Sequence, residues 1–147
     1  MNDLTEIDPK DLIVQHLPPK NAGGWNIGNS TGVRLYHKPS DITIEMDVHR
    51  SQHRNKHEAL TVLRDLLTEF KEGDVIVYGK DHIGEVVDVE DDGCSYKTED
   101  GVEVYDFFEY IAHTEEGCKY KQRLIILDNI AYFKEKVDEL EKRLEVL

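Results

Sequence analysis

The chain has 147 residues and a formal net charge of −13, with 18 Lys and Arg residues against 31 Asp and Glu residues. This length holds one ordinary domain or two small ones and argues against a single large enzyme fold. The acidic balance argues against a protein that coats nucleic acid nonspecifically, because phosphate binding needs clustered Lys and Arg. The charge is uneven, since residues 1–70 carry −2 and residues 71–147 carry −11. If RNA is contacted, the first half is the expected surface.

Residues 1–70 are predicted to form a small α+β unit. The segment 11–17 is expected to be extended and to end at Pro18-Pro19, because proline cannot continue a strand ladder. After a glycine-rich loop, residues 32–37 and 42–48 alternate apolar and polar side chains around a KPSD turn, which predicts a hairpin. Ser51 is a candidate N-cap for a helix through Glu69. Its apolar stripe is expected to pack on the hairpin and consists of Ala59, Leu60, Leu63, Leu66, Leu67 and Phe70.

Residues 71–113 are predicted to form a second small domain made of short strands. The runs DVIVYG, IGEVVDVE, CSYKT and VEVYDFFEYI are separated by tight turns, two of which end in Asp-Gly, a strong hairpin signal. Four or five short strands in about 40 residues predict a small SH3-like or Tudor-like β barrel.

Residues 114–147 are predicted to form a coiled-coil-like C-terminal helix, because their apolar residues make a heptad seam that runs to the last residue. With Ile130, Val137 and Leu144 at a positions, Lys136 falls at g and faces Glu141 at the following e position of a parallel partner. Three heptads alone are marginal in water. Two alternatives stay open: binding of a protein partner or second copy, and packing against the chain's own domains. The seam consists of Ile126, Ile130, Phe133, Val137, Leu140, Leu144 and Leu147.

Several common chemical sites are absent from the sequence. It has no P-loop, Rossmann glycine fingerprint, HExxH motif or Cys-x-x-Cys pair. His49, His53 and His57 are spaced by four residues, but His49 precedes the proposed helix cap, and no carboxylate or thiol is clearly placed to complete a metal shell. We therefore predict no metal and no cofactor, and we interpret these histidines as surface or RNA-contacting residues.

Cysteine content and hydropathy indicate the compartment. Cys94 and Cys118 are the two cysteines, and no run approaches the roughly 18 apolar residues that a membrane span needs. Two cysteines without an apolar signal-peptide core fit a reduced compartment better than a disulfide scaffold. We therefore expect a cytoplasmic protein.

Several motifs of the first half, in register, resemble one known family. They are IDPKDLIVQHL at residues 7–17, AGGW at 22–25 and VRLYHKPSDITIEMDVHRSQHRNKHEAL at 33–60. Together they resemble the catalytic domain of bacterial class I peptide-chain release factors, which shows an IDPKDL-like start, a GGQ loop, a VRxxHxPxxI hairpin and an RSQHxNK helix start. The resemblance spans residues 6–67 and includes no stop-codon-reading domain. It implies hydrolysis of peptidyl-tRNA in the ribosomal peptidyl transferase centre.

The resemblance makes Gly23, Gly24 and Trp25 the candidate catalytic positions, with tryptophan where the family has glutamine. Two glycines let the backbone approach the tRNA 3′ end, where backbone N–H groups can stabilise an oxyanion or position water. A glutamine amide both donates and accepts hydrogen bonds, whereas indole offers one N–H donor and a large apolar face. We therefore expect hydrolysis to be weak or lost.

Three interpretations of Trp25 stay open. Its ring can stack on an unpaired base of the CCA end, an interaction worth roughly 1–3 kcal/mol. Alternatively, the backbone N–H of residue 25 can sustain residual hydrolysis. In the third interpretation, the loop is released from catalytic constraint and the ring is buried against another surface.

A set of RNA contacts is expected around the loop, the hairpin and the helix start. The basic run at residues 50–56 opens the helix, where free N–H groups and the helix dipole add to the attraction for phosphate. The alternative is a solvated helix start, in which Ser51 caps the helix and Gln52 braces the hairpin. The expected RNA-binding residues are Lys20, Asn21, Arg34, His37, Lys38, Arg50, His53, Arg54 and Lys56.

These patterns predict a ribosome- or tRNA-associated, release-factor-like protein that modulates translation. The expected partners are rRNA, the tRNA 3′ end and a protein bound through the C-terminal helix, with no membrane and no DNA. A codon-independent peptidyl-tRNA hydrolase is the enzyme alternative, although the acidic C-terminal helix would be repelled by the mRNA channel that rescue factors fill with a basic tail. A third alternative is an adaptor that uses this fold away from the ribosome. A small chain with this architecture could be encoded by a phage genome.

Overall fold

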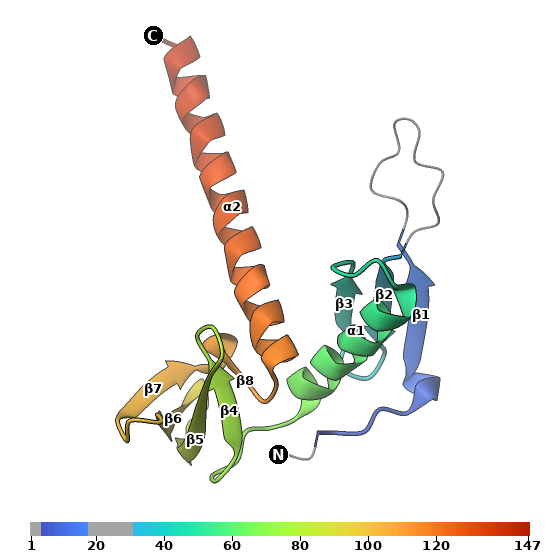
Figure 1. Ribbon diagram of the computed structural model, residues 1–147. Helices are drawn as coiled ribbons and strands as arrows, with labels where there is room; N and C mark the ends of the chain where they lie inside the picture. Colours follow the sequence, from blue (N-terminus) through green and yellow to red (C-terminus); the bar gives the residue numbers. More distant parts are fainter. Residues whose placement is uncertain (1–3, 18–30) are drawn as a thin grey trace.

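The residues that the structure describes form two antiparallel sheets and two α-helices (Figure 1). The structure is a computed structural model and describes residues 4–17 and 31–147. The first sheet has the strand order β1-β2-β3, and the second has the order β7-β6-β5-β4-β8. The α+β class predicted from the sequence is therefore confirmed.

The first sheet contains the predicted hairpin. Its strands are β1 (Leu12–His16), β2 (Val33–His37) and β3 (Ile42–Met46), and β1 follows a 3-10 turn, η1 (Pro9–Asp11). β2 pairs with both neighbours, so β1 lies at one edge and β3 at the other. Asp41 ends the hairpin turn with a φ of 57°, a conformation that aspartate tolerates better than most residues.

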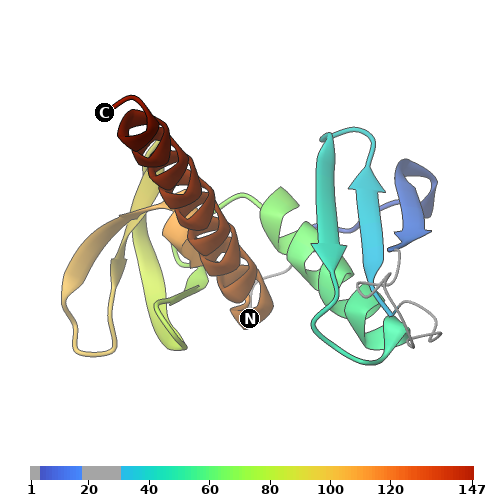
Figure 2. The same ribbon diagram turned by 90° about the horizontal axis from the view of Figure 1, so that it is seen from above.

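Helix α1 (Gln52–Leu67) covers one face of this sheet (Figure 2). Ser51 is its N-cap, as predicted, and its hydroxyl accepts a hydrogen bond from the N–H of Arg54. The helix ends two residues before the predicted Glu69, because Thr68 takes an extended conformation. The buried core between helix and sheet consists of Val33, Leu35, Ile44, Met46, Ala59, Val62, Leu63 and Tyr120.

The prediction that Phe70 packs on the hairpin is wrong. The helix has already ended at Leu67, so the chain turns before Phe70 and carries its ring to the second core. There the ring stacks on His113 and Phe108, with centroid distances of 4.2 and 5.0 Å.

The second sheet contains the predicted short strands. They are β4 (Val75–Tyr78), β5 (His82–Val89), β6 (Gly93–Lys97), β7 (Glu103–Phe107) and β8 (Ile111–Ala112). The last predicted strand is split, because a 3-10 turn, η2 (Phe108–Tyr110), separates β7 from β8 and lets β8 pair with β4. The sheet has its own buried core of Ile76, Val86, Cys94, Tyr96 and Ile111. The SH3-like or Tudor-like barrel form stays a prediction.

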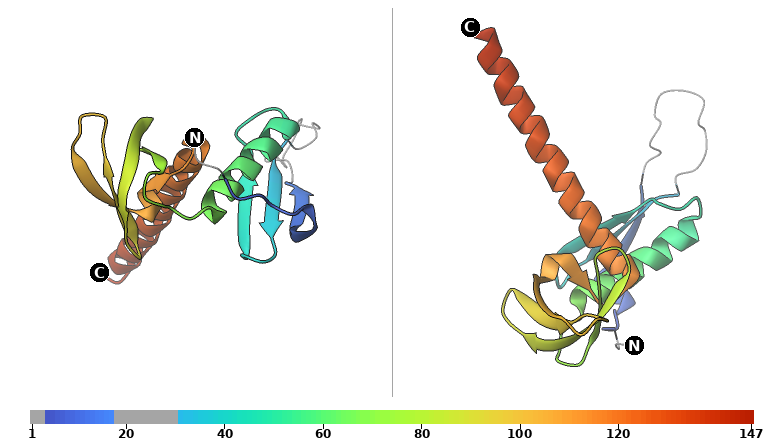
Figure 3. Two further views of the ribbon diagram at one scale, coloured as in Figure 1. Left: turned by 90° about the horizontal axis from the view of Figure 1, so that it is seen from below. Right: turned by 60° about the vertical axis from the view of Figure 1, so that its left-hand side comes forward.

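Helix α2 (Glu115–Glu145) begins between the two sheets and projects away from both (Figures 1 and 3). Its first turns pack on the rest of the molecule, and Tyr120 joins the core between α1 and the first sheet. From Ile126 onward its apolar seam is exposed, so within the described ranges the seam does not pack against the chain's own domains. Although α2 is long, none of the helices in the described part of the chain could cross a membrane.

Candidate functional site

The candidate catalytic segment, residues 18–30, joins the end of β1 to the start of β2. The loop residues Lys20, Asn21, Gly23, Gly24 and Trp25 lie outside the described residues. The structure describes the points where the segment begins and ends. His16 pairs with Val33 in the sheet, and the N–H of Leu17 donates a 3.0 Å hydrogen bond to the carbonyl of Gly32. The two ends of the segment are therefore held side by side.

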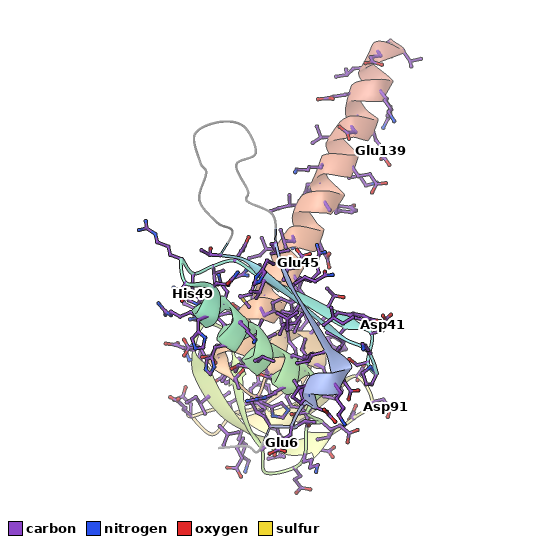
Figure 4. The ribbon with its side chains drawn as sticks, turned by 90° about the vertical axis from the view of Figure 1, so that its right-hand side faces the viewer. Glu6, Asp41, Glu45, His49, Asp91 and Glu139 are labelled. Carbon is purple, nitrogen blue, oxygen red and sulfur yellow. The ribbon has the colours of Figure 1, made fainter. Side chains whose placement is uncertain are left out.

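Asn55, in the second turn of α1, ties the end of that segment to the helix. Its side chain is fully buried, and Nδ2 donates to the carbonyls of Thr31 at 2.7 Å and His49 at 2.9 Å. Its Oδ1 accepts a 2.9 Å hydrogen bond from the N–H of His49. Figure 4 shows His49 beside the start of α1. One amide group thus fixes the end of the candidate loop, the connection from β3 and the helix to one another.

Two further contacts close the base of the loop. Gln52 Nε2 lies 2.5 Å from His16 Nδ1 and links the helix start to the end of β1. Gly32 has no room for a side chain, because a Cβ there would lie 2.9 Å from Leu17 Cδ1 and 3.2 Å from Asp47 Cβ. The base of the candidate loop is therefore tightly packed at Gly32, whereas the contact between Gln52 and His16 lies at the surface.

The expected RNA-binding residues at the start of α1 are open to solvent. They are Arg50, His53, Arg54 and Lys56, and Lys38 in the hairpin turn is exposed as well. The structure brings them to the end of the molecule where the candidate segment is anchored, apart from Lys38, which lies at the opposite end of the hairpin. Cations near the positive end of a helix dipole suit phosphate.

The other two expected RNA contacts in the hairpin are engaged within the chain. Arg34 and Glu45 face each other across β2 and β3, with a 2.7 Å ion pair and both side chains about half exposed. His37 is only 8% exposed, and its Nδ1 lies 2.7 Å from Ser40 Oγ. His37 therefore braces the hairpin turn, and its contact with RNA stays a prediction.

His49, His53 and His57, which are spaced by four residues, line one pocket. This pocket of about 470 Å³ lies between α1 and the start of α2. Its lining consists of His49, His53, Arg54, His57, Glu58, Thr61, Glu115, Glu116 and Lys119. His49 Nε2 contacts Glu58 Oε2 across it. In residues 4–17 and 31–147, no group of three His, Cys, Asp or Glu side chains has the arrangement of a metal site.

Asp65 links α1 to the start of α2. Its side chain is 1% exposed, and Oδ1 accepts a 2.9 Å hydrogen bond from the N–H of His113. Oδ2 accepts from both the N–H and the hydroxyl of Thr114, at 2.7 and 2.5 Å. Thr114 is in turn the N-cap of α2, and its hydroxyl accepts from the N–H of Gly117. One carboxylate therefore sets where α2 begins relative to α1.

Lys121 completes this junction from the side of α2. Its Nζ donates to the carbonyls of Phe108 at 2.9 Å and Ile111 at 2.7 Å, and it lies 5.4 Å from the centroid of Phe70. Burial lowers the pKa of Lys121. These contacts attach the first turns of α2 to the second sheet, as Asp65 attaches them to α1.

The sequence patterns missed Asn55 and Asp65, the two buried polar side chains that organise these contacts. Both lie on the apolar side of α1, since Asn55 precedes Ala59 by four residues and Asp65 follows Val62 by three. A polar residue at an apolar position of a helix is the signal that identifies them, because a buried polar group needs fixed partners.

A family model of the RF-1 domain matches residues 1–76, just over half of the chain. The chain belongs to the RF-1 domain family. Several similar proteins bear the name peptide chain release factor 1. Those of Dictyoglomus thermophilum and Dictyoglomus turgidum are each 37% identical over 84 residues, and that of Streptococcus thermophilus is 43% identical over 60 residues.

The matched part is a small share of these relatives. It covers 54% of this chain and 23% of each Dictyoglomus protein, and 40% of this chain and 17% of the Streptococcus protein. The RF-1 domain match contains the first sheet, α1, the loop base and every expected RNA-binding residue. It ends in β4, so β5 to β8 and α2 lie beyond it.

Proposed function

We propose that the protein associates with the ribosome and the tRNA 3′ end and modulates translation, with peptidyl-tRNA hydrolysis weak or lost. The proposal rests on one observation: an RF-1 domain chain carries Gly23-Gly24-Trp25 where the resemblance places the GGQ loop. The name of the relatives, peptide chain release factor 1, supports a role in translation. Trp25 retains its backbone N–H but lacks an amide that can hold a water molecule.

The contacts at the base of the loop support the proposal that residues 18–30 are presented from the same position as the GGQ loop of the family. Asn55 and Gln52 attach the chain at both ends of residues 18–30 to α1, and Gly32 has no space for a side chain beside Leu17 and Asp47. The contacts that hold the loop are thus present, while the side chain expected to position water is replaced. This combination favours binding by stacking of Trp25 on an unpaired base over hydrolysis.

Peptide release from ribosomes that carry labelled peptidyl-tRNA and an empty A site tests the chemistry. We expect little or no release by the wild-type protein and faster release by Trp25→Gln, since the amide restores a group that can orient water. Gly24→Ala serves as the control for backbone catalysis. Efficient release by wild type that Gly24→Ala abolishes would replace this proposal with the codon-independent hydrolase.

Cosedimentation with ribosomes tests whether the protein binds the ribosome, separately from whether it hydrolyses peptidyl-tRNA. Arg50→Glu should weaken binding and make the remaining binding less sensitive to salt, because a phosphate contact is lost. Arg64→Glu is the matched control, since it makes the same change at an exposed position near the other end of α1. Absence of wild-type cosedimentation would favour the adaptor that works away from the ribosome.

We also propose that the RF-1 domain ends near residue 70, that residues 71–113 form the separate small SH3-like or Tudor-like barrel, and that residues 114–147 form a coiled-coil-like helix whose first turns pack on both. Two separate hydrophobic cores, one under α1 and one inside the second sheet, support this division. Limited proteolysis tests this boundary. A linker between two domains is cleaved before either domain unfolds, so we expect the first cleavage at residues 71–74.

A further inference from the structure

The part of α2 beyond Ile126 carries a continuous apolar stripe that the described residues leave open. The seven seam residues from Ile126 to Leu147 are between 45% and 100% exposed. A soluble chain seldom leaves so many large apolar side chains in water along one line. Figure 4 shows Glu139 on this part of α2, well away from both sheets.

The residue types at the a and d positions of the seam indicate which kind of partner helix packs against it. Two of the three a positions carry β-branched residues, Ile130 and Val137, and the third carries Leu144. The four d positions carry Ile126, Phe133, Leu140 and Leu147, so the last two are leucine. β-branched residues at a with leucine at d favour two parallel strands. We propose that two copies of this chain pair through residues 126–147 as a parallel, in-register, two-stranded coiled coil.

The charges beside the seam agree with pairing between identical helices. In an in-register pair, Lys136 of each copy faces Glu141 of the other, which gives two opposite-charge contacts. Within one chain, Lys136 Nζ lies 3.3 Å from Glu139 in an exposed pair, a contact worth little in water. Residues 126–147 carry a net charge of only −2, so the strongly acidic character of the chain does not repel the two helices from each other.

The structure also removes the objection that three heptads are too short. The main cost of forming an isolated helix lies in its first turn. In α2 this turn is already formed, since Thr114 caps it, Asp65 holds the cap and Tyr120 is packed in a core. The exposed seam therefore extends a helix that is nucleated on the body of each copy.

The solution mass of the full chain tests the pairing. We expect twice the 17.0 kDa of one chain for the wild type and a single-chain mass for Val137→Asp. Asp138→Lys, one residue away and off the seam, is the matched control and should remain paired. A single-chain mass for wild type up to about 100 µM, or a three- or four-chain mass, would overturn the proposal.

The parallel orientation has its own test. Leu144→Cys, within α2, should form a disulfide between copies under mild oxidation, because identical a positions meet only in a parallel, in-register pair. The native Cys94 and Cys118 are buried, so the wild type serves as the uncrosslinked control. Failure of Leu144→Cys to crosslink while the mass stays doubled would contradict the parallel orientation. The proposed pairing does not depend on the proposed function, because it is argued from α2 alone. Solution mass tests the pairing, and cosedimentation with ribosomes tests the function.

A second, independent observation concerns the edge of the second sheet at β7 and η2. Tyr105, Phe107 and Tyr110 are 38% to 47% exposed there, and their rings are neighbours, with centroid distances of 5.9 and 6.4 Å. Phe107 lies opposite Gly93 in the ladder, so no neighbouring side chain on β6 screens its ring. The three rings form an open aromatic surface.

Carboxylates surround this aromatic surface. Asp92 accepts a hydrogen bond from the hydroxyl of Tyr105, and its carbonyl accepts one from the N–H of Phe108. The exposed acidic residues on the adjoining turn, strand and 3-10 turn are Glu90, Asp91, Asp92, Glu103 and Glu109. Aromatic faces and carboxylates both attract cations. We infer that this surface binds an Arg- and Lys-rich segment of a partner protein.

Calorimetric titration with a short oligo-arginine peptide tests this surface, with a glycine-serine peptide of equal length as the uncharged probe. Phe107→Ala and Tyr110→Ala should each weaken binding about two- to fivefold, since each removes an exposed ring that a guanidinium can cover. Tyr132→Ala removes an exposed ring from α2 instead and should leave binding unchanged. Equal binding by all variants would show attraction by net charge alone and would overturn the site.

Discussion

Asn55 Nδ2 donates a 2.7 Å hydrogen bond to the carbonyl of Thr31, which joins the second turn of α1 to the end of the candidate catalytic segment. The same amide also holds the backbone of His49 from both sides, as donor and as acceptor. A side chain that lies inside the basic run of the helix start is therefore structural, and the charged residues around it are free to face outward.

Asn55→Ala should lower the free energy of unfolding by about 2–3 kcal/mol, because it leaves buried backbone groups of Thr31 and His49 without their partner. Urea titration measures the loss. The neighbouring Lys56→Ala, at an exposed position, should change stability by less than about 0.5 kcal/mol. Equal stabilities for the two variants would contradict the role assigned to Asn55.

Asp65→Ala should destabilise the chain by about 3 kcal/mol, since the carboxylate accepts three hydrogen bonds while almost fully buried. Glu69→Ala is the matched control because Glu69 is exposed near the same helix end. Hydrogen exchange gives a second readout. The amides of Thr114 and Gly117 should lose protection in Asp65→Ala, and unchanged protection there would argue against its role at the start of α2.

Gly93→Ala should disrupt the second sheet through space alone. A Cβ at this position would lie 2.2 Å from the carbonyl oxygen of Asp106, a backbone atom that cannot move without opening the β6–β7 ladder. We expect a loss of about 3 kcal/mol in thermal or urea unfolding. Ser95→Ala on the same strand is the control and should be tolerated. A Gly93→Ala variant as stable as wild type would contradict the close approach of Gly93 to the Asp106 carbonyl.

Cys94 predicts a pH dependence. Burial raises the pKa of its thiol to about 11, from an ordinary value near 9, so the folded chain keeps a proton that the unfolded chain has released. Between pH 9 and about 11 the unfolded state therefore binds fewer protons, and the free energy of unfolding falls as the pH rises.

Urea titrations of wild type and Cys94→Ala across that range isolate this contribution, and the variant should show the shallower fall. A thiol reagent at pH 8 gives a simpler check. Both native thiols are buried and should react only after urea is added, whereas rapid labelling of the folded chain would contradict the burial of Cys94 and Cys118.

Much of the fold could be read from the sequence because its signals are local. The alternation in residues 42–48, the cap at Ser51 and the turns that end in Asp-Gly each depend on neighbours within a few residues. The structure has the corresponding hairpin, helix and strands, with β3 ending at Met46. The family likewise followed from short motifs in register, and the RF-1 domain match confirms it.

Tertiary structure decided what local patterns do not contain. Sequence spacing could not show that the helix ends before Phe70, that η2 divides the last strand, or that Asn55 and Asp65 each join segments far apart in the chain. These outcomes depend on which buried polar group finds which partner, a question of long-range packing. By itself the sequence determined the type and approximate place of most elements, the RF-1 domain and the replacement of glutamine by Trp25. The folded chain alone decided that Gly32 is tightly packed at the loop base and that the seam of α2 is exposed, because burial is a property of contacts between distant residues.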